Sequence, residues 1–208
     1  MSYLTGSHTD RQATEVSRRQ FLKNAAALSG GLTIAIYLPG CSKPEEAAST
    51  AVGKEVAANA WLHIDTDGAI KFLCDRSEMG QGVYTSLTTL IAEELGVEPK
   101  AIKVEFAPPG AEYGNSFVLG AQVTGGSTSV RDAWEKLRMA GAEARERLLA
   151  AGADRLHTSA SLCRIVNNGV SAGNKTISFG EIAAAAGALP KPQNINLKQR
   201  DFKFIGTK

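Results

Sequence analysis

Apolar and polar residues alternate over short runs in the middle of this chain, a pattern typical of strands that bury one face. Two such runs, residues 61–65 and 69–74, flank Asp67-Gly68, which favours a tight hairpin turn because glycine accepts the positive φ that the turn requires. Apolar residues then recur at helical spacing over residues 83–95, and residues 102–106 alternate again. The pattern predicts a strand hairpin, then a helix and a further strand.

A long irregular stretch, residues 108–128, separates these elements from a strong helical pattern over residues 129–151. Two short strand patterns follow within residues 162–177, around an Asn-Asn-Gly turn. Ser178 then opens a capping box at the start of a small alanine-rich helix over residues 179–189. Strands and helices in this order predict an α+β fold that ends in a small part built of strands and one helix.

The N-terminal residues predict a targeting segment. Residues 17–23 carry paired arginines in Ser-Arg-Arg-Gln-Phe-Leu-Lys, and residues 25–41 are uncharged and weakly apolar, which is typical of a twin-arginine signal. We therefore expect export to the periplasm through the twin-arginine translocase. Cys41 ends a candidate lipobox and would then be a lipid anchor, with simple cleavage nearby or retention of the segment as the alternatives.

Four regions follow from these patterns. Folding is expected to begin at Trp61, after a stretch of small and charged residues. The regions are a signal segment (1–41), a flexible linker (42–59), an α+β domain (60–189) and an extended tail without a docking signal (190–208).

Charge and composition narrow the range of functions. The chain has 208 residues, of which 43% are apolar and 21% are charged, values typical of globular proteins rather than of disordered or collagen-like chains. Residues 1–41 hold four of the 23 basic and two of the 21 acidic residues, so the remainder carries no net charge. A neutral body offers no basic surface to a nucleic-acid backbone, and we expect no nucleic-acid partner.

The cysteines favour neither a metal centre nor a disulfide framework. Cys41, Cys74 and Cys163 lie far apart, without the spacing of metal ligands. Cys74 and Cys163 are expected to be small buried residues, and a disulfide between them stays open for an oxidising compartment. His63 and His157 are expected to be structural or solvated. Trp61 and Trp134 are expected to lie in the core.

Two glycine-rich loops, each leading into a predicted helix, are the best candidates for binding. In the first, Gly80 and Gly82 flank Gln81, so the backbone can turn sharply while the amide side chain offers a donor and an acceptor. The second, residues 124–129, is Thr-Gly-Gly-Ser-Thr-Ser. Free backbone amides at a helix start attract an anion, so the two loops favour a phosphate ligand, with simple turns and side-chain helix caps as the alternatives.

Six motifs occur in order along the chain. They are the twin-arginine leader, Ser-Glu-Met-Gly-Gln-Gly (77–82), Ala-Glu-Glu-Leu (92–95), Thr-Gly-Gly-Ser-Thr-Ser-Val-Arg (124–131), Leu-Arg-Met-Ala-Gly-Ala (137–142) and Phe-Ile-Gly (204–206). Each is weak alone, but the series resembles the N-terminal portion of the molybdopterin-binding large subunit of the isoquinoline 1-oxidoreductase type. That group belongs to the xanthine oxidase and aldehyde oxidoreductase superfamily of molybdenum hydroxylases.

The resemblance implies a role at a molybdenum cofactor. In that superfamily a Gly-Gln-Gly loop and a Ser/Thr-rich loop contact the pterin and pyrophosphate, and bacterial members typically hold the molybdopterin cytosine dinucleotide form. The implied partners are the remaining part of the large subunit, which would share the cofactor, and a small two-iron–two-sulfur subunit. The cofactor-binding positions implied here are Gly80, Gln81, Gly82, Val83, Tyr84, Gly126, Ser127, Thr128 and Ser129.

Two departures from the family bear on activity. Relatives are several times longer, and their active-site glutamate lies in a late glycine-rich motif that this sequence lacks; Glu78, Glu93 and Glu94 match no such position. Residues 150–157 lack the family's usual tryptophan, and Leu156 is expected to fill its packing site. We therefore expect a truncated fragment of an aldehyde or N-heterocycle oxidoreductase that is not catalytic alone and holds no catalytic or metal-ligating residue. The alternatives are an exported phosphate-ligand binding module without redox chemistry and a non-functional truncated product.

Overall fold

The computed structural model describes residues 30–35, 60–110 and 113–207, and these form the α+β fold that the sequence predicts. Most of the predicted leader and the whole predicted linker lie outside the described residues. The elements in chain order are β1 (Leu32–Ala35), β2 (Ala60–Ile64), β3 (Ile70–Cys74), α2 (Val83–Leu95), η1 (Pro99–Ala101), β4 (Ile102–Phe106), α3 (Ser129–Leu156), η3 (Ala160–Leu162), β5 (Arg164–Val166), β6 (Gly169–Ala172), β7 (Lys175–Ser178) and α4 (Phe179–Ala188).

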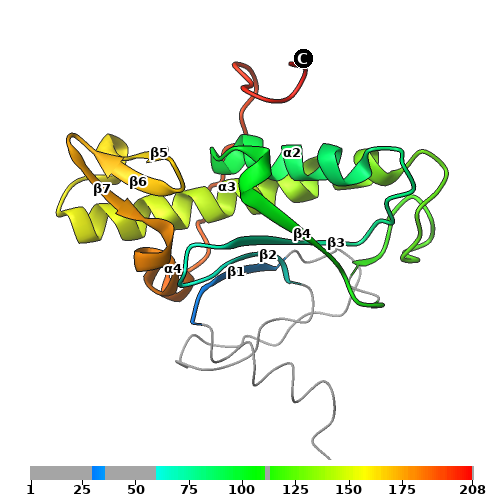
Figure 1. Ribbon diagram of the computed structural model, residues 1–208, viewed down its shortest axis with the longest axis horizontal. Helices are drawn as coiled ribbons and strands as arrows, with labels where there is room; N and C mark the ends of the chain where they lie inside the picture. Colours follow the sequence, from blue (N-terminus) through cyan, green and yellow to red (C-terminus); the bar gives the residue numbers. More distant parts are fainter. Residues whose placement is uncertain (1–29, 36–59, 111–112, 208) are drawn as a thin grey trace, which may run out of the picture.

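Four strands in the order β1-β2-β3-β4 form the main sheet, and helices α2 and α3 lie across one of its faces (Figure 1). β1, β2 and β3 pair in antiparallel fashion, whereas β4 runs parallel to β3 because α2 crosses over between them. The connection of β2 to β3 is the predicted hairpin, in which Gly68 has a φ of 87° and Asp67 Oδ1 accepts from Ala69 N at 2.7 Å. The sheet and the two helices share one core, in which Phe72 and Leu137 are fully buried.

Strand β1 extends the folded part beyond the point that the sequence indicated. We expected folding to begin at Trp61, and this is wrong for residues 32–35, which pair with β2. Leu32 and Ile34 are 0% and 1% exposed because their alternation places both on the core face of the sheet. Apolar residues that fit the core of a signal peptide thus supply an edge strand.

Glycines set the end of α2 and the crossing of α2 with α3. α2 ends where Gly96 adopts a φ of 85° and donates its N–H to a carbonyl of the last turn. α3 continues past its expected end to Leu156 and closes at His157, which adopts the left-handed conformation. The helices meet at Gly141, where a Cβ would lie 2.5 Å from Ile91 O.

A smaller sheet, β5-β6-β7, packs with α4 beside the C-terminal half of α3 (Figure 1). Its three strands are antiparallel. The capping box predicted at the start of α4 is confirmed, since Ser178 Oγ accepts from Glu181 N and Ser178 N donates to the Glu181 carboxylate at 3.0 Å. α3 approaches β6 closely at Gly152, where a Cβ would lie 2.5 Å from Val170 Cγ1.

Cys74 and Trp61 occupy the buried positions that were expected, whereas Cys163 and Trp134 do not. Cys74 is buried, Cys163 is partly exposed, and both are free thiols. Trp61 lies in the core. Trp134 is 40% exposed, so the core position expected for it is wrong; it lies on the outer side of α3, where the Arg138 guanidinium covers its ring at 5.0 Å.

The two histidines have structural positions. His63 is partly buried, with its Nδ1 2.9 Å from Thr33 Oγ1, while His157 closes α3. Leu156 is partly buried against the core, as expected of a packing residue. Within the described residues no group of three or more His, Cys, Asp or Glu side chains is placed to hold a metal ion. None of the helices in the described part is long and apolar enough to cross a membrane.

The tail after α4 is docked, contrary to expectation, by two buried glutamates of α2. Glu93 accepts hydrogen bonds from Lys198 Nζ at 2.8 Å and from Phe204 N at 2.7 Å. Glu94 accepts from Lys198 N at 3.2 Å and pairs with Arg138 at 2.6 Å. Burial acts to raise the pKa of Glu93, but the hydrogen bonds from Lys198 and the tail backbone outweigh it and lower that pKa to about 2. Glu93 and Glu94, which nothing in the helical pattern sets apart, therefore hold the tail against α2.

Candidate functional site

The two glycine-rich loops lie side by side at one end of the molecule (Figure 1, right). The first loop, residues 75–82, joins β3 to α2, and the second, residues 107–128, joins β4 to α3. Since β3 and β4 are parallel neighbours, their carboxyl ends lie at the same edge of the sheet. Ser77 N donates to Thr124 Oγ1 at 2.8 Å, which joins the loops directly.

Gln81 folds back onto its own loop. Its Oε1 accepts from Met79 N at 2.5 Å, and its Nε2 donates to Ser77 O at 2.8 Å. Gly80 and Gly82, with φ of 91° and 76°, supply the left-handed conformations that the turn needs. A Cβ at either glycine would meet no described atom within 4 Å, so the backbone there faces open space. The Gln81 side chain therefore stiffens a turn that presents its glycine backbone.

Glu78 already partners the amides at the start of α2. Its Oε1 accepts from Gly80 N at 2.8 Å and Gly82 N at 3.0 Å, and its Oε2 accepts from Tyr84 N at 3.0 Å. The hydrogen bond from Tyr84 does most to lower the pKa of this carboxyl, and those from Gly82 and Gly80 add to it. The expectation of free amides is therefore wrong at these three positions. An acidic residue just before a helix start is a signal that favours this self-capping.

The second loop places its hydroxyl groups without capping α3 through a side chain. Thr128 precedes the helix, but its Oγ1 donates to Gly125 O at 2.8 Å and accepts from Asn115 Nδ2 at 2.7 Å. Gly126 and Ser127 both adopt left-handed conformations, with φ of 62° and 53°. For serine this conformation costs roughly 1–2 kcal/mol, so the surrounding structure imposes the shape of the loop.

The nine predicted binding residues divide into packing and exposed positions. Val83 is 3% exposed and belongs to the core, and Tyr84 packs in part against it. Thr128 is buried, while Gly82 and Ser129, the first residue of α3, are partly exposed. Cofactor binding by these residues stays a prediction. The exposed members, which the contact between the loops brings to one end of the molecule, are Gly80, Gln81, Gly126 and Ser127.

A buried ion-pair cluster beneath the loops ties the end of β3 to α3. Arg76 is 1% exposed and donates to Asp75 Oδ2 at 2.5 Å and to Asp132 Oδ2 at 2.8 Å. Asp132 also pairs with Lys136 at 2.8 Å and accepts from Ser116 N at 2.9 Å. These five residues, which we call the loop clamp, come from both loops and from α3. The loop clamp therefore fixes the two loops relative to each other.

The negative charge of Asp75 in the loop clamp is only partly balanced by its neighbours. Burial raises the pKa of Asp75 to about 6, although the adjacent Arg76 favours its charged form. Asp75 Oδ1 and Arg76 Nε are buried and have no hydrogen-bond partner within the described residues. Burial also acts to raise the pKa of Asp132, but hydrogen bonds from Lys136 and Ser116 hold it below its ordinary value. No sequence pattern predicts this cluster, because Arg76 and Asp132 are 56 positions apart.

Comparison with known proteins identifies the family. The family model of the molybdopterin cofactor-binding domain matches residues 7–206. The chain belongs to the molybdopterin cofactor-binding domain family. This confirms the resemblance that the sequence motifs indicated.

Two curated relatives of this molybdopterin-binding chain are each 31% identical to it. One is the membrane-bound aldehyde dehydrogenase (pyrroloquinoline-quinone) of Gluconacetobacter polyoxogenes, matched over 86% of this chain and 22% of its own length. The other is the isoquinoline 1-oxidoreductase subunit beta of Brevundimonas diminuta, matched over 64% of this chain and 17% of its own length. The chain thus spans about a fifth of the length of these relatives.

Two solved structures also resemble the chain. The Cu,Mo-CO dehydrogenase in its carbon monoxide reduced state has a TM-score of 0.44 and 20% identity, over 60% of this chain and 15% of that one. Quinoline 2-oxidoreductase from Pseudomonas putida 86 has a TM-score of 0.37 and 19% identity, over 62% of this chain and 16% of that one. Both are far longer than the chain described here.

The donors and the space at the two loops fit a molybdopterin group. Open space in front of the Gly80 backbone allows a ligand to approach closely. The backbone N–H groups of Gln81, Gly126 and Ser127 make no hydrogen bond to other described residues, and such groups suit phosphate and pterin oxygens. Three further backbone N–H groups, those of Gly80 and Gly82 in the first loop and of Tyr84 in α2, donate to the Glu78 carboxylate.

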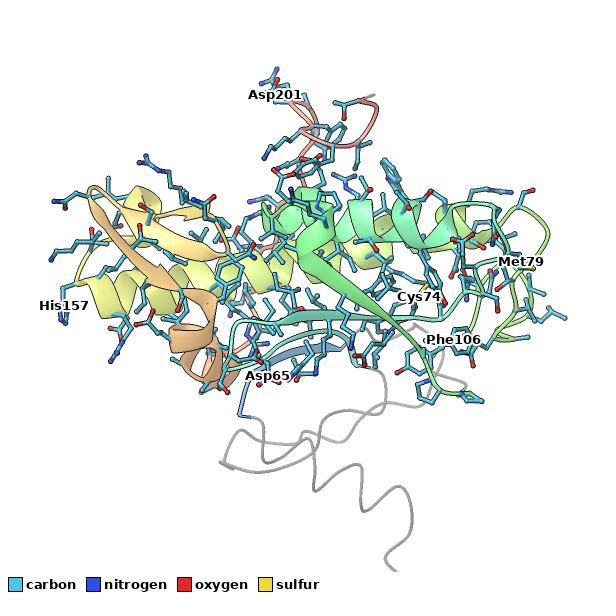
Figure 2. The ribbon with its side chains drawn as sticks, in the orientation of Figure 1. Asp65, Cys74, Met79, Phe106, His157 and Asp201 are labelled. Carbon is cyan, nitrogen blue, oxygen red and sulfur yellow. The ribbon has the colours of Figure 1, made fainter. Side chains whose placement is uncertain are left out.

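Several exposed apolar side chains lie in the two loops of this molybdopterin-binding candidate and at the end of β4. Leu119 is fully exposed with a φ of 50°, an unusual conformation for leucine, and Asn115 Oδ1 holds the same turn by accepting from Phe117 N at 3.0 Å. Figure 2 shows Met79 and Phe106 at this end of the molecule, opposite the end that carries His157. We define the apolar rim by its members: Met79, Phe106, Phe117, Leu119 and Val123.

Proposed function

We propose that this chain contributes one wall of the molybdopterin-dinucleotide site in an exported molybdenum hydroxylase that oxidises aldehydes or N-heterocycles. One observation carries the proposal: the two loops that hold the family motifs are joined by the bond from Ser77 to Thr124 and by the loop clamp. The names of the two curated relatives, an aldehyde dehydrogenase and an isoquinoline oxidoreductase, support these substrate classes.

Each loop has a defined part in this proposal. The backbone N–H groups of Gln81, Gly126 and Ser127 donate to the phosphates and pterin of the cytosine dinucleotide form, and the exposed Ser127 hydroxyl adds a donor. The Gln81 side chain keeps the first turn in shape through its bonds to Met79 and Ser77. When bound, the molybdenum group supplies the two-electron oxidation of the substrate carbon.

Proton transfer needs a group from outside these loops. Glu78 accepts from three amides and has a lowered pKa, which makes it a weak base, while Asp75 is buried beneath the loops. We therefore propose that the chain is not catalytic alone and shares the cofactor with the remaining part of a large subunit. A small two-iron–two-sulfur subunit would accept the electrons. The apolar rim supports such an assembly because it exposes apolar side chains next to the proposed site.

A periplasmic location, reached through the twin-arginine translocase, completes the proposal. It depends on the paired arginines within residues 17–23, which lie outside the described residues together with Cys41, the candidate lipid anchor. Replacement of Arg18 and Arg19 by lysine, followed by cell fractionation, tests this part. We expect the periplasmic protein to disappear, and an unchanged distribution would contradict export by this route.

Gly80→Ala and Gly173→Ala form a matched pair for testing the site. Both glycines have positive φ, 91° and 61°, and open space around a Cβ, so both substitutions strain the backbone without a steric clash. Only Gly80 lies in the proposed site. The full chain is co-expressed with the polypeptide encoded next to it, and molybdenum and released cytidine monophosphate are measured in the purified protein. We expect Gly80→Ala to weaken cofactor binding about tenfold, which corresponds to about 1.4 kcal/mol, and so to carry less molybdenum than Gly173→Ala, which should retain nearly all.

Other outcomes of this experiment would overturn the proposal. Equal molybdenum in both variants would contradict the site, and wild-type protein without molybdenum would contradict the function. If the purified protein held pyrroloquinoline quinone instead of molybdenum, its cofactor would be the one named for one relative, and the proposal would be overturned. Stabilisation by nucleotides alone would favour an exported phosphate-ligand binding module. Uniformly fast amide exchange would favour a non-functional truncated product.

A further inference from the structure

Residues 31–35 combine two roles that conflict. In the sequence they belong to the apolar part of the predicted twin-arginine leader, and in the structure they lead into and form strand β1. Thr33 pairs with His63 of β2, and Leu32 and Ile34 on either side of it are 0% and 1% exposed. A segment that is removed after export would not be expected to complete a core.

The backbone around β1 fits its neighbours too closely for other residues. A Cβ on Gly31 would collide with Ile64 O, and a Cβ on Gly187 of α4 would lie 2.8 Å from Gly31 O. Two elements distant in sequence thus approach β1 at positions where only glycine fits. Thr33 Oγ1 lies 2.9 Å from His63 Nδ1, so a side-chain hydrogen bond also joins β1 to β2. This close fit indicates that β1 is an integral strand of the sheet.

Loss of β1 would damage the rest of the domain. Leu62 and Ile64 of β2 are fully buried, and α4 packs against β1. Without β1, β2 would become an edge strand with unpaired backbone groups beside uncovered apolar surface. Such an edge promotes aggregation, which is costly for a protein that is exported in its folded state.

We propose that residues 31–35 are a permanent strand of the domain and stay attached to it in the exported protein. Any processing of the leader therefore takes place before Gly31. The candidate lipobox at Cys41 is not a cleavage site, because cleavage there would remove β1. This inference is independent of the proposed cofactor, and it uses the proposed export only to say where the mature chain is found.

Mass spectrometry of the exported protein tests where processing takes place. The full chain is produced in its native host, and the periplasmic and membrane fractions are digested with proteases. We expect peptides that span residues 31–35 to be as abundant as peptides of α3. A mature chain that begins after residue 35 would overturn the proposal. A chain found only in the cytoplasm would contradict the proposed export, and the stability of β1 variants would then decide the present inference.

Substitutions in β1 of the full chain test the strand independently of export. Ile34→Ala removes a core side chain and should lower the Tm by on the order of 10 °C. The control Leu162→Ala changes a leucine that is 68% exposed and should lower the Tm by less than about 2 °C. Thr33→Val keeps the side-chain volume but removes the hydrogen bond to His63, and it should lower the Tm by a few degrees. This milder variant keeps the test valid if Ile34→Ala does not fold. An unchanged Tm in both β1 variants would show that the strand is dispensable.

Discussion

Asp132→Asn measures how much the loop clamp contributes to stability. The substitution keeps the shape of the side chain but removes the charge that faces Arg76 Nη2 and Lys136 Nζ, each at 2.8 Å. Arg76 is 1% exposed and keeps only Asp75 as an ionic partner, so its charge stays buried with less compensation. Breaking a buried ion pair in this way costs about 3–5 kcal/mol. That is a large part of the roughly 5–15 kcal/mol by which a typical domain is stable.

Urea unfolding at neutral pH, followed by tryptophan fluorescence, measures the loss. Trp61 is buried, and its ring centroid lies 5.6 Å from that of Tyr113, so its emission reports on the region next to the second loop. Glu105→Gln is the matched control. It also converts a carboxylate to an amide in an ion pair, with Lys103 at 2.9 Å, but at the surface, where such a pair contributes at most about 1 kcal/mol.

The loss of unfolding free energy should be at least about 2 kcal/mol greater in Asp132→Asn than in the control. Amide exchange adds a local measurement: Ser77 N, which donates to Thr124 Oγ1, should exchange faster in Asp132→Asn, whereas the amides of α4 should not change. Equal losses in the two variants, with unchanged exchange at Ser77, would refute the role assigned to the loop clamp.

Three further predictions concern a buried acid, the tail and the helix crossing. Burial raises the pKa of Asp75 from 3.8 to about 6, so between these pH values the folded state binds a proton that the unfolded chain has released. The unfolding free energy should therefore fall by up to about 3 kcal/mol as the pH rises from 3.8 to 6. Urea titrations at a series of pH values should show that Asp75→Asn removes this fall, and an identical pH dependence in both proteins would contradict it. Glu93→Gln should accelerate amide exchange at Phe204 about tenfold, because a charge-assisted hydrogen bond is lost; unchanged exchange would mean that other contacts hold the tail. Gly141→Ala places a Cβ 2.5 Å from Ile91 O and should lower the Tm in calorimetry, since overpacking costs about 1–3 kcal/mol against a helix-propensity gain of about 1 kcal/mol; a raised Tm would contradict the close crossing.

Local signals were enough to predict most elements of the body. The hairpin followed from Asp67-Gly68, whose bonds close within the turn itself, and α4 followed from the pair Ser178 and Glu181. The end of α2 followed from Gly96, which closes the last turn in the left-handed conformation. In each case the residues that determine the structure lie within a few positions of one another.

Two elements show where a local pattern admits more than one structure. Gly152 favours a helix end before it, yet α3 continues because the missing side chain makes room for Val170 of β6. The apolar alternation of residues 32–35 suits a signal peptide as well as a strand. These residues form a strand because they pair with β2, which would otherwise have a free edge. No residue close to β1 in the sequence indicates this pairing.

The sequence indicated both loops of the candidate site but not what joins them. Ser77 and Thr124 are 47 positions apart, and Arg76 and Asp132 are 56 apart, so no spacing rule connects either pair. Their contact depends on the parallel pairing of β3 with β4, which brings both loops to one edge of the sheet. Tertiary structure alone therefore places the two candidate anion sites together.

The acidic residues of the family motifs act on the chain itself. Glu78 accepts from two amides of its own loop and from Tyr84 N of α2. Glu93 accepts from the tail, and Glu94 accepts from Arg138 and the tail backbone. A carboxylate that transfers protons needs a pKa near the working pH and access to the substrate. The pKa of Glu93 is about 2, and that of Glu78 is also lowered, because their donors stabilise the charged form. Protonation would weaken the hydrogen bonds that Glu78 and Glu93 accept. These acids therefore position the first loop and the tail, and their contacts do not suit them to proton transfer.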